Sequence, residues 1–265
     1  MEFWREALVF LGGLWAGTIN TIVGSGSLVT FPILVALGYG PVNAIISNAM
    51  GLVAGGFSGA YGYRREAASA RRTLVRLLPA SLAGGLLGAF LLLILPEKVF
   101  GYVAPVLIVV AILLVVFQPR LSAWAKARQA LGHITPEEAD HQRLPAVLYV
   151  LVFLIGVYGG YFTAAQGVLL MAALGIFFHG TLQQSNAVKV ILTLVVNLVA
   201  AVAYLLFAFD RINWLVVLLI AVGSTIGGFL GAGIGRRMRP GVLRFVIVLL
   251  GLMALIDMTL RLVRG

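Results

Sequence analysis

The chain has no cysteine, which excludes disulfide bonds and thiolate metal sites. Charged residues are also scarce, because they make up 11% of the 265 residues while hydrophobic residues make up 61%. Soluble domains carry about 25% charged residues, so this composition excludes a soluble protein. The net charge of +10 would suggest nucleic acid in a soluble chain, but the basic residues fall mostly in short segments between apolar runs. We therefore predict a polytopic protein embedded in the lipid bilayer, with no nucleic-acid partner.

Motifs for catalysis are missing as well. No G-x-x-x-x-G-K-[ST] loop is present, so the chain does not itself use ATP through a P-loop. The three histidines are scattered without metal-ligand spacing, and the GSGS stretch at Gly24 lacks a nearby histidine base. No acidic residue lies in the central apolar segments, which gives little support to a buried carboxylate proton relay. We predict that the protein is not an enzyme and holds no metal or cofactor.

Ten apolar segments predict an all-α fold of two halves, with five helical segments in each half. The first five are 5–23, 27–38, 41–62, 74–95 and 99–117, and the second five are 145–163, 167–178, 185–208, 214–234 and 242–262. A spanning helix needs about 20 residues, so 27–38 and 167–178 are expected to be half-helices, re-entrant pieces or buried short spans. Arg5 before the first apolar run resembles a signal peptide, but no small-residue cleavage site follows, and we predict a first helix there.

The two halves are related in sequence. Residues 47–49 read SNA, as do residues 185–187, and SLAGGLLGAF from Ser81 matches STIGGFLGAG from Ser224. The segment 13–17 likewise matches 156–160, and the order of the matches is the same in both halves. We therefore predict three parts: a first transmembrane repeat over 1–117, a cytoplasmic linker over 118–144 and a second repeat over 145–265.

Basic residues predict that the repeats are inverted. The first half carries its arginines between its third and fourth segments, whereas the second half carries them between its fourth and fifth. If both loops are cytoplasmic, as the positive-inside rule requires, equivalent segments cross the membrane in opposite directions. Both termini are then expected outside. Arg261 and Arg264 argue mildly against that orientation.

The short segments carry the candidate site. In an inverted repeat, broken segments meet near the bilayer midplane, and their helix N-termini favour an anion. The first break is GSGSL from Gly24, and the second is TAAQGVL from Thr163. The alternative is that these glycines only allow close helix packing. Two polar breaks at symmetric places favour a substrate site, for which the candidate residues are Asn20, Thr21, Gly24, Ser25, Gly26, Ser27, Asn48, Gln166, Gly167, Asn186 and Lys189.

Lys189 is the one basic residue that lies well inside a predicted membrane segment. A cation at such a place normally faces the protein interior with a partner, where it would attract an anionic substrate or alternate between substrate and a carbonyl group. The alternative is that it snorkels to the cytoplasmic interface. Asn48 and Asn186 hold equivalent places in the repeats, and each is either a substrate ligand or a structural link.

Two long stretches closely resemble the sulfite exporter TauE/SafE family of membrane transporters. They read GTINTIVGSGSLVTFPILVALGYGPVNAIISNAMGLVAGGFSGAYGYRRE and GVYGGYFTAAQGVLLMAALGIFFHGTLQQSNAVK. The resemblance implies a bacterial inner-membrane protein of two related halves that moves sulfite, sulfonates or related organosulfur anions. The family's motif positions fall here on Asn20, Thr21, Gly24, Gly26, Pro32, Asn48, Gly160, Gln166, Gly167, Asn186 and Lys189. The second half departs from the first, since it has no counterpart of Pro32 and has Lys189 in place of Gly51.

The sequence thus predicts a secondary transporter of small sulfur-containing anions that works by alternating access. An anion channel, a carrier of other organic anions and a membrane scaffold without transport activity stay open as alternatives. The expected partners are the anionic substrate and the bilayer. A coupling ion, either proton or sodium, and a second copy of the chain are partners that the sequence leaves open.

Overall fold

The computed structural model describes residues 3–130, 135–234 and 240–264, and helices account for nearly all of them. Every one of the ten predicted segments is a helix. The first five are α1 (Phe3–Ile22), α2 (Ser27–Ala36), α3 (Pro41–Gly62), α5 (Arg71–Ile94) and α6 (Glu97–Ala130). The second five are α8 (Ala146–Phe162), α9 (Gln166–Phe177), α10 (Leu182–Phe207), α11 (Trp214–Ile234) and α12 (Pro240–Arg264). The all-α prediction is therefore confirmed, and α2 and α9 are the short helices.

Helix α6 is longer than the predicted segment 99–117, because it continues to Ala130 and so covers about half of the range 118–144. Residues 118–130 include four Ala, two Arg and two Gln, which are good helix formers in water. A short helix, α7 (Pro136–His141), lies in the rest of this range. Thr135 and Glu138 form a capping box at its start, and the hydrogen bonds from Thr135 lower the pKa of the Glu138 carboxyl.

Four helices of the described residues are long and apolar enough to cross a membrane by length and composition. They are α5, the part of α6 from Glu97 to Arg120, α10, and α11 from Trp214 to Gly233. Four shorter apolar helices accompany them: α2, α8, α9 and the part of α12 from Ile247 to Leu260. Many large apolar side chains on these helices are exposed, as expected for a surface that lipid covers.

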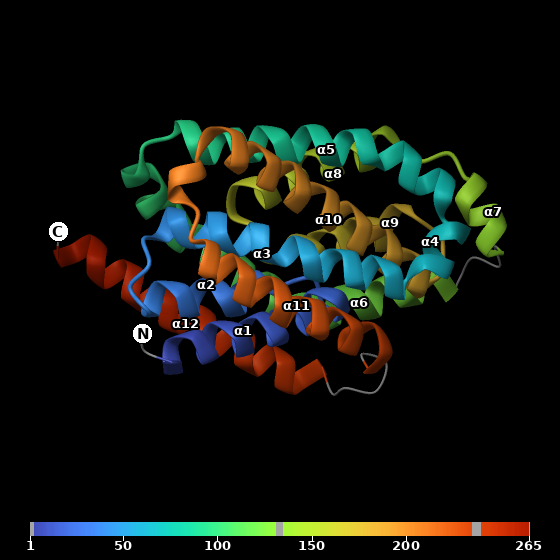
Figure 1. Ribbon diagram of the computed structural model, residues 1–265. Helices are drawn as coiled ribbons and strands as arrows, with labels where there is room; N and C mark the ends of the chain where they lie inside the picture. Colours follow the sequence, from blue (N-terminus) through green and yellow to red (C-terminus); the bar gives the residue numbers. More distant parts are fainter. Residues whose placement is uncertain (1–2, 131–134, 235–239, 265) are drawn as a thin grey trace.

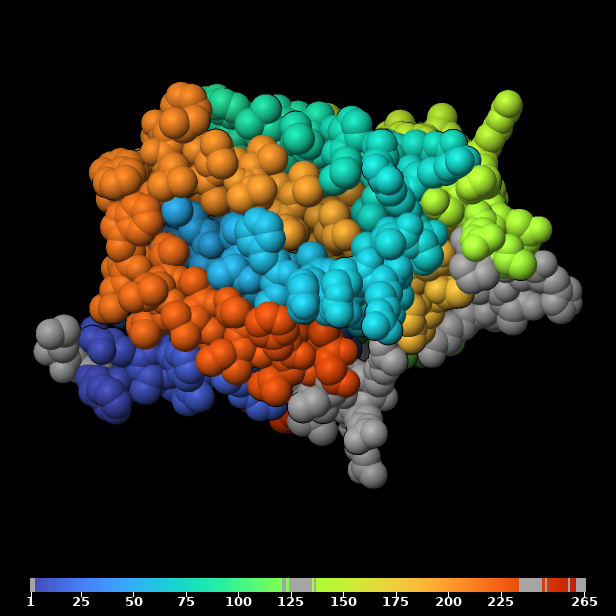
Figure 2. All heavy atoms as spheres, turned by 45° about the vertical axis from the view of Figure 1, so that its right-hand side comes forward, coloured from blue at the N-terminus to red at the C-terminus, as the bar shows by residue number. Residues whose placement is uncertain are grey.

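The two halves of the chain interdigitate. Helix α1 packs mainly against α11, and α5 packs mainly against α8, so each of these pairs joins one half to the other. In the face that Figure 2 shows, α5, α10, α3, α11 and α1 lie in successive bands, and helices of the first and second halves alternate. Each half therefore buries its apolar surface against the other.

Equivalent helices run in opposite directions in Figure 1: α3 runs from left to right and α10 from right to left, and the pairs α1 and α8, and α5 and α11, are likewise opposed. The start of α1 and the end of α12 lie at one end of the molecule, and α7 and α4 (Arg64–Ser69) lie at the other. These directions agree with an inverted repeat, which stays a prediction together with the orientation in the membrane.

Glycines allow the closest helix crossings, and their register differs from the sequence match. A Cβ on Gly84 would overlap the carbonyl oxygen of Phe153, and a Cβ on Gly223 would overlap that of Phe10. Phe10 and Phe153 are equivalent in the match of α1 with α8, so the packing equates Gly84 with Gly223. The sequence match pairs Gly84 with Gly227 instead, which is one helical turn away. Repeated glycines at four-residue spacing make the two registers look alike in sequence.

Candidate functional site

The two breaks meet in the middle of the molecule. The backbone N–H of Gly167, at the start of α9, donates a hydrogen bond of 2.9 Å to the carbonyl oxygen of Gly24, just before α2. A Cβ on either glycine would overlap the Cα of the other, so only glycine permits this approach. The N-terminal ends of α2 and α9 are thereby brought side by side.

The backbone at both breaks adopts the left-handed region. Gly24 has φ of 86°, while Thr163 and Ala165 in the second break have φ of 67° and 58°. Threonine and alanine adopt such angles only at a cost of about 1–3 kcal/mol, which the surrounding structure must supply. Such strain concentrates at functional sites. Here the positive φ angles turn the chain sharply between α8 and α9.

Three buried side chains at the breaks carry polar atoms with no hydrogen-bond partner in the described chain. These are the hydroxyl of Ser25, the Nδ2 group of Asn48 and both polar atoms of Gln166. The three residues are at most 1% exposed. An unpartnered buried polar group costs about 1–3 kcal/mol of folding stability. Several such groups together are better explained by a ligand-binding site than by a contribution to stability.

Thr30 fixes the direction of the Asn48 amide. The Thr30 hydroxyl, one turn inside α2, donates to the Oδ1 atom of Asn48 on α3. The acceptor end of this amide is therefore occupied, and its free end is the NH₂ group, which can only donate. Sequence reasoning missed Thr30, because nothing in the order of residues shows that α2 and α3 turn these two side chains toward one another.

Lys189 faces the protein interior and does not snorkel, since it is 1% exposed. Its Nζ donates to the carbonyl oxygens of Thr21 and Ile22 at 3.1 and 3.4 Å, and to Oδ1 of Asn186 at 3.2 Å. All three ammonium protons thus have acceptors within the protein. Lys189 holds the C-terminal end of α1, where carbonyl groups and the helix dipole favour a cation.

The other predicted residues lie around these contacts. Gly26 packs closely on Asn20, because a Cβ at Gly26 would lie 2.9 Å from the Asn20 Cβ. Ser27 begins α2 and is buried. The Thr21 hydroxyl donates to the carbonyl oxygen of Gly17, and the Thr21 carbonyl oxygen accepts from Lys189. The structure therefore gathers the candidates into two groups, one at the paired breaks and one around the Lys189 ammonium.

Three further polar side chains on α10 lack partners in the described chain, namely the Oγ atom of Ser185, the Oγ1 atom of Thr193 and the Oδ1 atom of Asn197. All three are buried, and Thr193 and Asn197 lie one turn apart on the helix that carries Lys189. Thr193 was not a sequence candidate. Its four-residue spacing from Lys189 and from Asn197 is the signal that could have indicated it.

At the end of the molecule that holds α4 and α7, the linker is tied to both halves. The Asp140 carboxylate of α7 accepts hydrogen bonds from the backbone N–H groups of Arg72 and Thr73, at 3.0 and 2.8 Å. Gln142 contacts Nδ1 of His179, which lies between α9 and α10. The Asp140 carboxylate thereby provides acceptors for two amides in the first turn of α5. Its negative charge is stabilised by the positive end of the α5 helix dipole.

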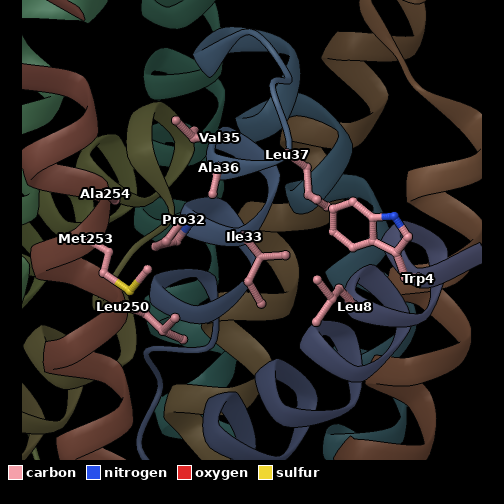
Figure 3. A pocket seen from close by; sticks show the side chains of 10 residues that line it. All are labelled: Trp4, Leu8, Pro32, Ile33, Val35, Ala36, Leu37, Leu250, Met253 and Ala254. Atoms are coloured by element: carbon pink, nitrogen blue, oxygen red, sulfur yellow. The ribbon is translucent and has the colours of Figure 1, made fainter. Parts of the chain in front are cut away.

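An apolar groove of about 460 Å³ lies apart from this polar centre. Figure 3 shows Pro32 and its neighbours on α2 between Trp4 and Leu8 on one side and Met253 with two other α12 residues on the other. With no charged side chain in its lining, the groove suits lipid chains better than a small anion.

Apolar helices with two polar breaks buried among them define a multi-pass membrane protein built in the manner of transporters. A family model described as "Sulfite exporter TauE/SafE" matches residues 9–258, and the chain belongs to this family of membrane transporters. The match confirms the family resemblance seen in the sequence.

Bacterial relatives agree with this membership. The chain is 26% identical over 249 residues to a "probable membrane transporter protein" of Haemophilus influenzae, which covers 93% of this chain and 91% of the relative. It is 26% identical to "probable membrane transporter protein ORF9" of a Sinorhizobium species, over 89% and 84% of the two chains. It is 25% identical to "probable membrane transporter protein YfcA" of Escherichia coli, over 87% and 79%. No solved structure shows a significant match. The protein is thus a multi-pass transporter of the bacterial inner membrane.

Proposed function

We propose that the protein carries small sulfur-containing anions, such as sulfite, sulfonates or related organosulfur acids, by alternating access. The observation that supports this most is the set of unpartnered groups at the paired helix breaks: the Ser25 hydroxyl, the Asn48 NH₂ and the Gln166 amide. They lie at or beside the N-terminal ends of α2 and α9, where the helix dipoles favour an anion. The binding site lies between these two breaks.

The chemistry of this site favours an oxyanion. The hydroxyl and the two side-chain amides without partners supply donors that match an anion with several oxygen atoms. A sulfite or sulfonate group has three oxygens and can use more donors than a carboxylate can. The Lys189 ammonium contributes positive charge from the adjacent end of α1, although its protons are already bound within the protein.

The comparisons support the class of cargo only through a name. The family is described as sulfite exporters, whereas the relatives are named membrane transporters with no stated substrate. Alternating access is supported by broken helices that meet at the centre and by equivalent helices that run in opposite directions (Figure 1). In such an arrangement, packed groups of helices drawn from both halves can move against one another around the central site.

A panel of anions tests this function on the purified protein in detergent. We expect sulfite, thiosulfate, sulfoacetate or another sulfur oxyanion to raise the unfolding temperature, because a ligand that binds only the folded state stabilises it by mass action. Carboxylates of the same charge and size are the matched controls. Equal stabilisation by carboxylates would contradict a sulfur-specific site, and no stabilisation by any anion would contradict the site itself. Saturable uptake into proteoliposomes separates a carrier from a channel, whose flux is conductive.

The substitution Gln166→Leu should separate binding from stability. The loss of hydrogen bonds to a charged ligand costs about 1.5–3 kcal/mol, so we expect the Kd of the anion to rise roughly tenfold to a hundredfold. The unliganded protein should keep its stability or gain some, since two unpartnered polar atoms leave the interior. Titration of the unfolding temperature against anion concentration measures both quantities.

Gln184→Leu is the matched control, because Gln184 is also a buried glutamine in the first turn of a helix. Its side chain is fully used: Oε1 accepts from the N–H of Thr181 in a capping box, and Nε2 donates to Ser69. We expect this variant to lose about 1–2 kcal/mol of stability with unchanged anion affinity. The opposite pattern, with Gln166→Leu losing stability and keeping affinity, would show that Gln166 is structural.

A further inference from the structure

The three oxygens around the Lys189 ammonium form a ligand set that suits a small cation. Two are carbonyl oxygens from the C-terminal end of α1, Thr21 and Ile22, and the third is the amide oxygen of Asn186. In transporters with broken helices, carbonyl groups at helix ends of this kind coordinate coupling cations. Here the position is filled by a side chain of the protein itself.

We propose that Lys189 is a tethered cation that permanently fills a monovalent-cation site made by the end of α1 and Asn186. Its consequence for transport rests on the proposed function: no free cation needs to bind at this break when an anion is carried. The positive charge that a coupling ion would bring is built into α10.

Several observations favour the charged ammonium over a neutral amine. An ammonium has three protons, and Lys189 has three acceptors. A neutral amine would leave one acceptor without a donor. Within the described chain these oxygens are its only partners, and no carboxylate pairs with it. The negative end of the α1 dipole, together with the oxygen ligands, therefore provides its compensation.

The second half of the chain treats the equivalent place differently. Gly51, which matches Lys189 in the repeats, has no side chain. The residues that match Thr21 and Ile22 are Ala164 and Ala165, just after α8, and with glycine at position 51 helix α3 supplies no ammonium to them. The tethered cation therefore belongs to one of the two breaks.

The variant Lys189→Ala tests this assignment by chemical complementation. It removes Cγ, Cδ, Cε and Nζ, which together correspond to n-propylammonium. The full-length variant is purified in detergent, and its unfolding temperature is measured in n-propylammonium chloride, in tetramethylammonium chloride at equal ionic strength and with 1-propanol. We expect a lowered unfolding temperature that only n-propylammonium raises, by a few degrees, while the native protein responds alike to both salts.

Leu192→Ala is the control for a cavity without cation ligands, because Leu192 is fully buried on the same helix. We expect no selective effect of n-propylammonium on Leu192→Ala. In the double variant Lys189→Ala with Asn186→Ala, the rescue by n-propylammonium should be weaker than in Lys189→Ala alone. If Lys189→Ala is not recovered as folded protein, recovery of monodisperse protein extracted in each salt becomes the readout. Equal rescue by 1-propanol, equal rescue of Leu192→Ala or equal failure in both salts would overturn the proposal. None of these measurements requires an anion or transport, so such a result would leave the proposed function standing.

Discussion

Gly24→Ala is expected to prevent recovery of folded protein, or to lower its stability by several kcal/mol. An L-residue at φ of 86° costs about 1–3 kcal/mol in backbone strain alone. The added Cβ would also overlap the Cα of Gly167, which is backbone and cannot rotate away. The hydrogen bond between the two breaks would be lost together with this approach. Thermal unfolding and size-exclusion profiles in detergent measure the effect.

Gly40→Ala provides the comparison. Gly40 has φ of −58°, and a Cβ there would meet nothing within 4 Å. It lies at the start of α3, where the change from glycine to alanine should cost less than about 1 kcal/mol. If Gly24→Ala and Gly40→Ala behave alike, the close approach of the breaks is not what holds the centre together.

Lys189→Met is expected to weaken both the fold and the proposed anion site. It keeps most of the length of the side chain but leaves the carbonyl oxygens of Thr21 and Ile22 without their donor, a loss of about 3–5 kcal/mol for a buried charged contact. It also removes the positive charge near the breaks. Unit charges about 10 Å apart interact by about 1.7 kcal/mol at an effective dielectric constant of about 20. The anion Kd should therefore rise more than tenfold.

The two effects of Lys189→Met can be measured separately. The unfolding temperature without anion reports the fold, and the anion concentration that gives half of the maximal stabilisation reports binding in the folded fraction. Unchanged anion affinity in a destabilised variant would assign Lys189 to the end of α1 alone. Unchanged stability would contradict the role of its three contacts.

Much of the fold could be predicted from the sequence because membrane helices are set by apolar length. The ten apolar runs became ten helices, and α2 and α9 were short enough to identify as incomplete spans. The extension of α6 could not be predicted in this way, because its residues beyond 117 are polar and read as a linker. Apolar length says nothing about a helix that leaves the membrane.

The site could be predicted at the level of residue types but not of contacts. Glycine and polar breaks indicated where the chain would turn, and the position of Lys189 inside an apolar segment indicated a buried cation. The rotation of α2 against α3 joins Thr30 to Asn48. This rotation depends on how both helices pack against helices from distant parts of the chain. The sequence also left open whether Lys189 bonds substrate or protein, because both readings require the same residue at the same depth.

The alternation of the two halves has a consequence for biogenesis. Helix α1 finds its main partner only in α11, which ends at Ile234, so nearly the whole chain must be synthesised before the first helix can settle. Until then, the glycine-lined face of α1 lies open to lipid or to the insertion machinery, whereas α5 waits only for α8, which ends at Phe162. Assembly of this transporter is therefore completed late in translation, and a chain truncated before α11 leaves its first helix without its main packing partner.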